Sequence, residues 1–509
     1  MKRVKIALLN SIASFVQYAV KIIVQFLLVP ILVTGLGEAL YGAWLILIRS
    51  VGFISAADGR PTQALKWVIA NEQLSDEHQL KRKAIGSALG VAFLMMPLMA
   101  FLGFTVAWFA PHLTGIGQEH DTIMRVVSAI LVFNLMLTVL VMLPESVIHG
   151  MNMSYKRMGL VSLVDITGGL LVFLLISYGA GIIGVASALM VQTSLSGILF
   201  LILAKKYLPW FGFEKVSYLE IRKFFNISVW YSGWNLAQRI LISSDVVIIG
   251  VLMSAVLVTD YTLTAYISTT LVTALSMVVA AATPGLGGLI GNKEYSKALN
   301  LHREMLLLSL LLIAAFGVTI LIWNHSLVAM WVGADHYVGD GINLLMVILA
   351  MQLLLMRNDA YLIDATLDIK KKVKMGFVAS IVMVISSAVL GQKYGLIGIC
   401  IGLFLGRSIL NFAYPVIICK FLGGDILEHY KTMVLPFVVV LSLFMMVFLV
   451  GPAPVVESWF HLSLFAILTV FVVMVLVFFI GFSRAHRNQI YNRYKSFRGT
   501  KKLGRVGNG

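Results

Sequence analysis

NSIASFVQYAVKIIVQFLLVPILVTG, residues 10–35, is an apolar stretch with a single line of polar side chains along it. These polar residues recur at spacings of three or four, so on an α-helix they stack on one face. A lysine facing lipid at mid-span would cost roughly 2.5–3.5 kcal/mol. The sequence therefore predicts a membrane-spanning helix whose polar face points at protein or at a wet cavity. The polar residues are Asn10, Ser14, Gln17, Lys21 and Gln25.

The same pattern returns 218 residues later, which indicates an internal repeat. Each polar position again holds a polar residue, and the basic Lys21 matches the basic Arg239. We therefore predict two equivalent halves, with Lys21 and Arg239 facing each other across a central cavity. The alternative for each neutral residue is a helix–helix contact, a common role for Ser, Asn and Gln in membranes. The second set is Ser228, Ser232, Asn235, Arg239 and Ser243.

Further matches follow in the same order along both halves, which predicts equal topology and a pseudo-two-fold axis along the membrane normal. Tyrosines open the second helix of each half, a proline-containing turn follows it, and a tyrosine–glycine turn joins the fifth and sixth helices. These matches are Tyr41 with Tyr261, 59–61 with 282–284, and Tyr178 with Tyr394.

Composition and charge distribution indicate a polytopic membrane protein. Of the 509 residues, 60% are hydrophobic and 12% are charged, about half the charged fraction of a soluble protein. Runs of about 20 apolar residues give fourteen predicted spans. With the N-terminus inside, thirty of the 39 Lys and Arg fall in inner segments and only Lys393 in outer loops. The net charge of +16 therefore reflects topology and does not indicate nucleic-acid binding.

The predicted fold is all-α, with two pseudo-symmetric six-helix lobes and two extra C-terminal helices. Both termini are expected to be cytoplasmic, and the external loops are too short for a catalytic domain. We interpret the linker between the lobes, with Trp210, Phe211 and Phe213, as an interfacial segment on the inner surface. The predicted divisions are 1–204 (N-lobe), 205–225 (linker), 226–420 (C-lobe), 421–481 (helices 13 and 14) and 482–509 (basic cytoplasmic tail).

Five cations near mid-span are the strongest functional signal in the sequence. Together they would cost on the order of 12–17 kcal/mol against lipid, so they must be solvated, paired or held for an anionic ligand. Arginine grips phosphate through its planar fork and lysine acts as a point charge. Because cations outnumber acids at this depth, the pattern favours a phosphate-bearing ligand. The cations are Lys21, Arg49, Arg239, Arg357 and Arg407, with Gln17, Gln25, Asn235 and Asn411 as polar cavity residues.

Internal pairing is the alternative for two of these cations. Arg357 has Asp359 and Asp364 nearby in sequence, and Arg239 has Asp245. A coupling ion, H⁺ or Na⁺, would be carried by a buried carboxylate, and the candidates are Asp165 and Asp245.

Other acid and histidine residues are expected to have structural roles. Asp58, near Arg60, is expected to fix the inner end of the second helix. His149 and His302 are interpreted as inner-surface residues. We expect no metal site and no organic cofactor, because the sequence contains no Walker motif, metal-ligand cluster or nucleophile triad.

Four short motifs resemble the polysaccharide transporter family of the multidrug/oligosaccharidyl-lipid/polysaccharide (MOP) superfamily, which includes Wzx-type O-antigen flippases. In the second lobe, Asp260 directly precedes Tyr261, where the family often has Leu-Gly then Gly-Tyr. The motifs are Val29-Pro30-Ile31-Leu32-Val33-Thr34-Gly35-Leu36-Gly37, Tyr41-Gly42-Ala43-Trp44, Asp58-Gly59 with Ala64, and Ser244-Asp245-Val246-Val247-Ile248-Ile249-Gly250.

The resemblance implies a MATE-like fold and a non-enzymatic flippase of the bacterial cytoplasmic membrane. Such proteins move undecaprenyl-diphosphate-linked oligosaccharide, such as an O-antigen unit for lipopolysaccharide, from the inner to the outer leaflet. Expected partners are the lipid-linked glycan, membrane lipids and the polysaccharide polymerase and chain-length machinery, with no nucleic acid. The family's cavity cations correspond by position to Lys21, Arg49, Arg239 and Arg407.

Three other functions are alternatives. An ion-coupled multidrug exporter of the same superfamily would favour acids in its cavity, whereas cations predominate here. A lipid II-type flippase, in which two extra helices form a groove for the lipid tail, fits fourteen spans. A glycan polymerase or ligase would need a large outer loop.

Overall fold

The computed structural model describes residues 2–73, 75–280, 282–366, 369–481 and 487, and every regular element within them is a helix. Thirteen of these helices are long and apolar enough to cross a membrane, so the chain is a multi-pass membrane protein. The predicted basic tail lies outside the described residues except for Arg487, as do the side chains of Asn10 and Ser228.

Contacts divide the chain into two compact units. They group α8 (Tyr218–Leu252) with the N-terminal helices, whereas the repeat predicts α8 as the first helix of the second lobe. The predicted lobe boundaries therefore stay a prediction from the repeat. Unit 1 is Met1–Thr262 with Gly376–Ile399, and unit 2 is Leu263–Met375 with Cys400–Gly509.

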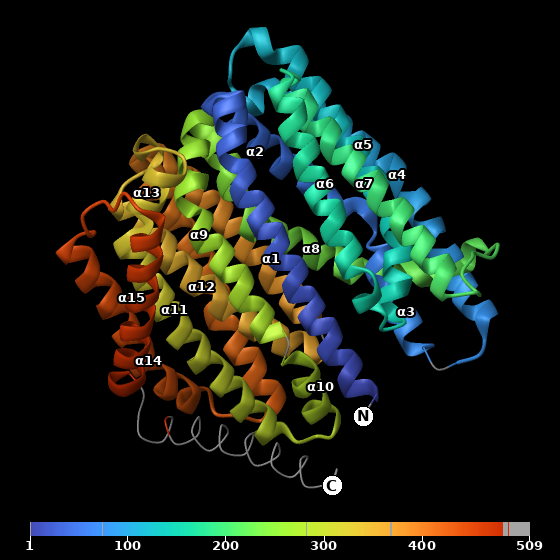
Figure 1. Cartoon of the computed structure of the whole chain (residues 1–509). Coiled ribbons are helices and arrows are strands. Elements are labelled where there is room, and N and C mark those ends of the chain that lie inside the picture. Colours follow the sequence, from blue (N-terminus) through green and yellow to red (C-terminus); the bar gives the residue numbers. More distant parts are fainter. Residues whose placement is uncertain (1, 74, 281, 367–368, 482–486, 488–509) are drawn as a thin grey trace, which may run out of the picture. The chain divides into compact units, whose positions relative to one another are not determined.

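In unit 1, α5 packs against both α4 and α7, and α1 runs along α6 (Figure 1). The short α3 lies against α4 and α5, and α2 packs on α8. The elements are α1 Lys2–Leu36, α2 Glu38–Ile54, η1 Ser55–Asp58, α3 Pro61–Asn71, α4 His78–Thr114, η2 Gln118–His120, α5 Asp121–Gly150, η3 Ser154–Lys156, α6 Met158–Ser177, α7 Gly181–Tyr207 and α8.

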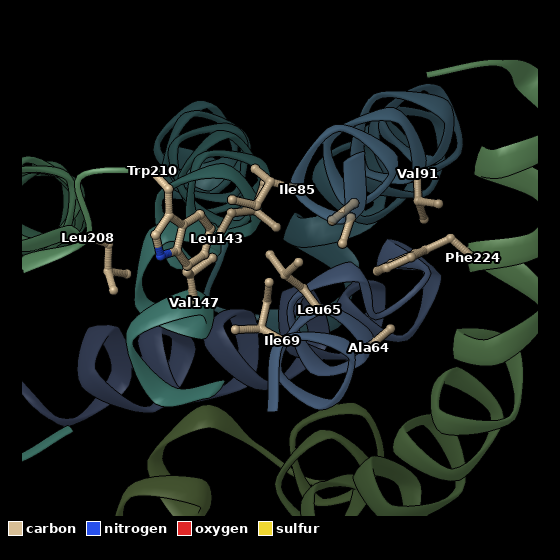
Figure 2. Close-up of a cluster of buried hydrophobic side chains, with 12 residues drawn as sticks. Ala64, Leu65, Ile69, Ile85, Val91, Leu143, Val147, Leu208, Trp210 and Phe224 are labelled. Atoms are coloured by element: carbon tan, nitrogen blue, oxygen red, sulfur yellow. The ribbon is translucent and has the colours of Figure 1, made fainter. Parts of the chain in front are cut away.

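The segment between α7 and α8 is docked on unit 1. Trp210 is 7% exposed and lies beside Leu143 and Val147 in the apolar cluster of Figure 2. Arg82 Nε donates a hydrogen bond to the Trp210 carbonyl oxygen at 2.8 Å, and Lys81 Nζ lies 5.3 Å from the Trp210 ring centroid. The indole therefore fills the core between α3, α4 and α5, whereas Phe213 of the same segment is exposed, and the interfacial interpretation of the segment stays a prediction.

In unit 2, α11 is the central helix and packs on α12, α14 and α15. α9 (Ala255–Ala280) begins in unit 1 and continues into unit 2. The other elements are α10 Thr283–Gly291, α11 Tyr295–Trp331, η4 Ala334–His336, α12 Asp340–Ala365, α13 Lys370–Leu422, α14 Ile426–Val450 and α15 Trp459–Ile480.

α13 is broken at Gly395, whose φ of 59° and ψ of −141° are not helical. This conformation favours glycine because it has no Cβ. The sequence predicts two spans, 375–391 and 396–419, on either side of this residue. The structure has thirteen candidate spans among its described residues because α13 counts as one helix, whereas the sequence predicts two spans there. The total of fourteen spans therefore stays a prediction.

The two proline-containing turns predicted as equivalent both lead into a short helix. Pro61 is the first residue of α3 and Pro284 is the second residue of α10, in the first turn where a proline costs no helical hydrogen bond. The residues before the two helices differ, because Arg60 is left-handed and Ala282 is right-handed. The sequence predicts a single span over 256–290, because the apolar run continues past the break at Ala282 that separates α9 from α10.

Candidate functional site

A cluster of three arginines and one aspartate in unit 1 is the candidate site. α2 supplies Arg49, whose Nη1 donates a hydrogen bond to Ser243 Oγ on α8 at 3.5 Å. One helical turn before Ser243, Arg239 interacts electrostatically with Arg49, Arg60 and Asp58. Two of the five predicted cavity cations, Arg49 and Arg239, therefore lie in one cluster, and Arg60 joins them.

A tight turn between η1 and α3 places Arg60 in this cluster. Gly59 and Arg60 both have left-handed backbone conformations, with φ of 72° and 50°. The Arg60 N–H donates to Asp58 Oδ1 at 2.7 Å, which stabilises the turn, and Pro61 then starts α3. Asp58 thus fixes the turn that follows α2, and it also supplies the cluster's carboxylate.

Arg239 packs closely against α2. A Cβ added to Gly52 would lie 2.9 Å from Arg239 Nη1, so a glycine at this position gives the guanidinium room. The buried Asn235 approaches η1, with its Nδ2 3.4 Å from the Ser55 carbonyl oxygen. Asn235 therefore makes a contact between helices, which is the alternative to a role in the cavity. Its role toward a ligand stays a prediction.

The cluster has an excess of positive charge. Three guanidinium groups face one carboxylate among the described residues that interact with Arg239. Burial lowers the pKa of Arg60, and the nearby Asp58 carboxylate opposes that shift. Because like charges held close together repel, an anion with several oxygens would stabilise the cluster by accepting hydrogen bonds from the guanidinium groups.

Lys21 belongs to a different group of side chains, on α1, α6 and α7. It is exposed and acts electrostatically on Asp165, which accepts a hydrogen bond from Gln192 Nε2 at 2.9 Å. On the same helix Gln17 is half-buried and Gln25 is exposed. The expected placement of Lys21 opposite Arg239 stays a prediction.

Asp245, the other candidate for ion coupling, is held by α9. Tyr261 donates its hydroxyl hydrogen to Asp245 Oδ2 at 3.1 Å, and the Val246 N–H donates to Oδ1 at 2.9 Å. Arg239 instead interacts with Asp58, the one acid that acts on it among the described residues.

The remaining predicted cations lie in unit 2. Arg357 Nη1 donates to Ser276 Oγ at 3.1 Å, and Arg407 is buried. Near Arg407, Asn411 Nδ2 donates to the Gln352 carbonyl oxygen at 3.2 Å.

The acids considered as partners for Arg357 are engaged by other residues. Asp359 is bound to His302 at 2.9 Å, and Asp364 is bound to Lys372 at 2.7 Å. His302 is fully buried, so its interpretation as an inner-surface residue is wrong. No cluster of metal-ligating side chains occurs in the part of the chain that the structure describes.

No family model and no curated protein matches this chain. Solved structures match over most of its length. The lipid II flippase MurJ, in an inward closed conformation, gives a TM-score of 0.66 over 92% of this chain and 97% of that chain, with 15% identity. An inward-facing multidrug resistance MATE family transporter of the MOP superfamily gives 0.60 over 82% of this chain and 95% of that chain, with 14% identity.

A MOP superfamily transporter from Pyrococcus furiosus, described as having a binding pocket of reversed polarity, gives a TM-score of 0.53 with 15% identity, over 83% of this chain and 97% of that chain. The flippase match covers 92% of 509 residues, more than the 422 residues that end at α13, so it extends into the final helices. The chain therefore has the fold shared by the MATE multidrug transporters and the lipid II flippase of the MOP superfamily.

Proposed function

We propose that this protein is a flippase that moves a lipid-linked oligosaccharide across the membrane, gripping its diphosphate with Arg49, Arg60 and Arg239. The observation that supports this proposal most directly is the arginine cluster of unit 1, in which Arg239 interacts electrostatically with Arg49, Arg60 and a single carboxylate, Asp58, among the described residues. A diphosphate supplies several charged oxygens at the spacing of planar guanidinium forks, and it compensates the excess charge.

The fold supports a transport cycle by alternating access, in which two helical halves move about a central site. In this proposal, the diphosphate docks on the arginines, the glycan occupies the aqueous space and the lipid tail stays in the bilayer. The membrane is the bacterial cytoplasmic membrane, the lipid is undecaprenyl, and the glycan is an O-antigen or similar repeat unit passed on to a polymerase.

Charge distinguishes this proposal from a multidrug exporter for cationic compounds. Such an exporter needs acids facing its substrate, because a cation is repelled by three nearby arginines. The reversed pocket polarity described for the Pyrococcus furiosus transporter supports the view that this fold can carry sites of different charge.

The proposal is tested by a flipping assay with the full-length protein in liposomes. A fluorescent polyprenyl diphosphate oligosaccharide is loaded, and its arrival in the opposite leaflet is followed by lectin accessibility. Arg49→Gln and Arg239→Gln should each lower the rate at least about tenfold, because each removes a charge-assisted hydrogen bond worth about 1.5–3 kcal/mol.

Arg125→Gln is the matched control, because Arg125 lies over the Trp108 ring elsewhere in unit 1. It should flip at the wild-type rate. Equal rates for wild type, Arg49→Gln and Arg239→Gln would contradict the docking role. Movement of a cationic dye without movement of the glycan lipid would support an exporter.

A further inference from the structure

Unit 2 contains a buried histidine–aspartate pair that the proposed function does not use. His302 on α11 is fully buried, and its Nε2 lies 2.9 Å from Asp359 Oδ1 on α12. Asp359 is only 3% exposed. A carboxylate removed from water is costly unless a partner compensates it, so the imidazole donates to Asp359 in the tautomer with its proton on Nε2.

A second imidazole covers this pair. His429 on α14 is 3% exposed and stacks on His302, with ring centroids 6.4 Å apart and planes at 11°. The Nδ1 atoms of His302 and His429 are both buried, and neither has a hydrogen-bond partner among the described residues. A buried nitrogen without a partner is unusual in a folded protein, and each can accept a proton.

The cations near the histidine–aspartate pair form ion pairs with other carboxylates. Arg303, next to His302, is bound to Glu428 by a 3.0 Å ion pair. Asp364 on α12 is bound to Lys372, and α10, which packs on α11 and α12, has no titratable side chain. Among the described residues, the titratable groups around the pair from α11, α13, α14 and the N-cap of α14 are Arg303, Tyr414, Cys419, Asp425, Glu428, His429 and Tyr430.

We propose that His302 and Asp359 form a proton-binding site whose occupancy controls the packing of α14 against α11. A proton from solvent water adds to His302 Nδ1 and returns to water on release, with no electron transfer. Uptake converts an anionic pair into an imidazolium–carboxylate pair with no net charge, and a histidine is suited to such exchange near neutral pH.

Proton binding is linked to helix packing because His302 Nδ1 has no hydrogen-bond partner among the described residues and the His302 ring stacks on His429 of α14. Once protonated, Nδ1 becomes a donor that has no acceptor among the described residues, and the stacked His429 ring gains a cationic neighbour. A buried N–H donor without an acceptor is unfavourable, so uptake of the proton favours a shift of α14 that gives Nδ1 access to water. This inference goes beyond the proposed function, since it depends on no substrate.

The test counts protons taken up by the full-length protein in lipid nanodiscs. Weakly buffered samples are moved from pH 8 to pH 5.5, and a pH-indicator dye reports the protons bound per chain. His302→Gln should bind about one proton fewer than wild type. His120→Gln, which removes a partly exposed histidine, calibrates the signal from a single ring.

Equal proton counts for wild type and folded His302→Gln would overturn the proposal, because a structural histidine that never titrates predicts no change. If His302→Gln fails to fold, ¹⁵N-histidine NMR of wild type replaces it. A buried ring that becomes doubly protonated between pH 8 and pH 5.5, and that is absent from Asp359→Asn, supports the site. Histidine signals that all belong to exposed rings contradict it.

The link to α14 has its own readout. Hydrogen exchange of residues 426–435, corrected for the intrinsic pH dependence, should rise at least several-fold at pH 5.5 in wild type and not in His302→Gln. The same exchange at both pH values in wild type would contradict the control of α14.

Discussion

Buried ionic groups at the C-terminal end of α5 depend on one another. Glu145 on α5 forms a close ion pair with Arg157, and His149 Nε2 lies 2.6 Å from Arg157 Nη2. Ser154 Oγ lies 2.7 Å from His149 Nδ1 and completes the network. Burial lowers the pKa of Arg157, and the Glu145 carboxylate opposes the shift. Each member therefore compensates the desolvation of another.

Arg157→Gln should destabilise the protein by about 3–5 kcal/mol, because it leaves the Glu145 charge buried without its partner. The measurement is the thermal unfolding midpoint in nanodiscs, which should fall. Lys297→Gln is the control, since it removes an exposed ion pair with Glu294 and should change stability by less than about 1 kcal/mol. Equal midpoints for wild type and Arg157→Gln would show that the network contributes nothing to stability.

At the scale of one element, the start of α8 is fixed by a capping box. Ser217 accepts a hydrogen bond from the Glu220 N–H at 3.3 Å, and Glu220 Oε2 accepts one from the Ser217 N–H at 2.7 Å. These bonds satisfy backbone N–H groups of the first turn that have no partner within the helix. The helix dipole also favours a negative charge at this end of the helix. The cap holds α8 to the docked segment that contains Trp210.

Hydrogen bonds from Ser217 lower the pKa of Glu220 below its ordinary value of 4.5, with a smaller effect from Lys83. The folded state therefore gains stability from this group above about pH 4.5, and loses it as pH falls through the lowered pKa. Glu220→Gln should increase hydrogen exchange at residues 218–222 near pH 7, and the difference from wild type should vanish at pH 3.

Lys83→Gln is the matched variant, because it removes the 3.7 Å ion pair to Glu220 and keeps the capping box. It should leave exchange near the wild-type level. A Glu220→Gln effect that persisted unchanged at pH 3 would contradict the assignment to the ionised carboxylate.

For the whole molecule, hydropathy was sufficient to predict the long helices, because each spans a bilayer and carries few charges. It could not separate α9 from α10, since apolar residues continue through the break, and it left the number of spans dependent on Gly395. The all-helical architecture, with a fold shared by MATE transporters and the lipid II flippase, confirms the predicted fold class.

The candidate site was predicted only in part. Arg49 and Arg239 were identified from their depth in apolar helices, but Arg60 was not, because its position depends on two consecutive left-handed residues. The His302–Asp359 pair joins residues 57 positions apart, so no local pattern could reveal it. Nonlocal contacts of this kind follow from packing rather than from spacing along one helix.

The most direct test of the arginine cluster is a comparison of diphosphate and monophosphate binding by the full-length protein in nanodiscs. Native mass spectrometry would measure the Kd of a polyprenyl diphosphate oligosaccharide and of its monophosphate counterpart. Wild type should prefer the diphosphate at least about tenfold, and Arg49→Gln, Arg60→Gln and Arg239→Gln combined should lose that preference. Equal affinity of wild type for both lipids, or an unchanged preference in the triple variant, would contradict recognition of the diphosphate by these arginines.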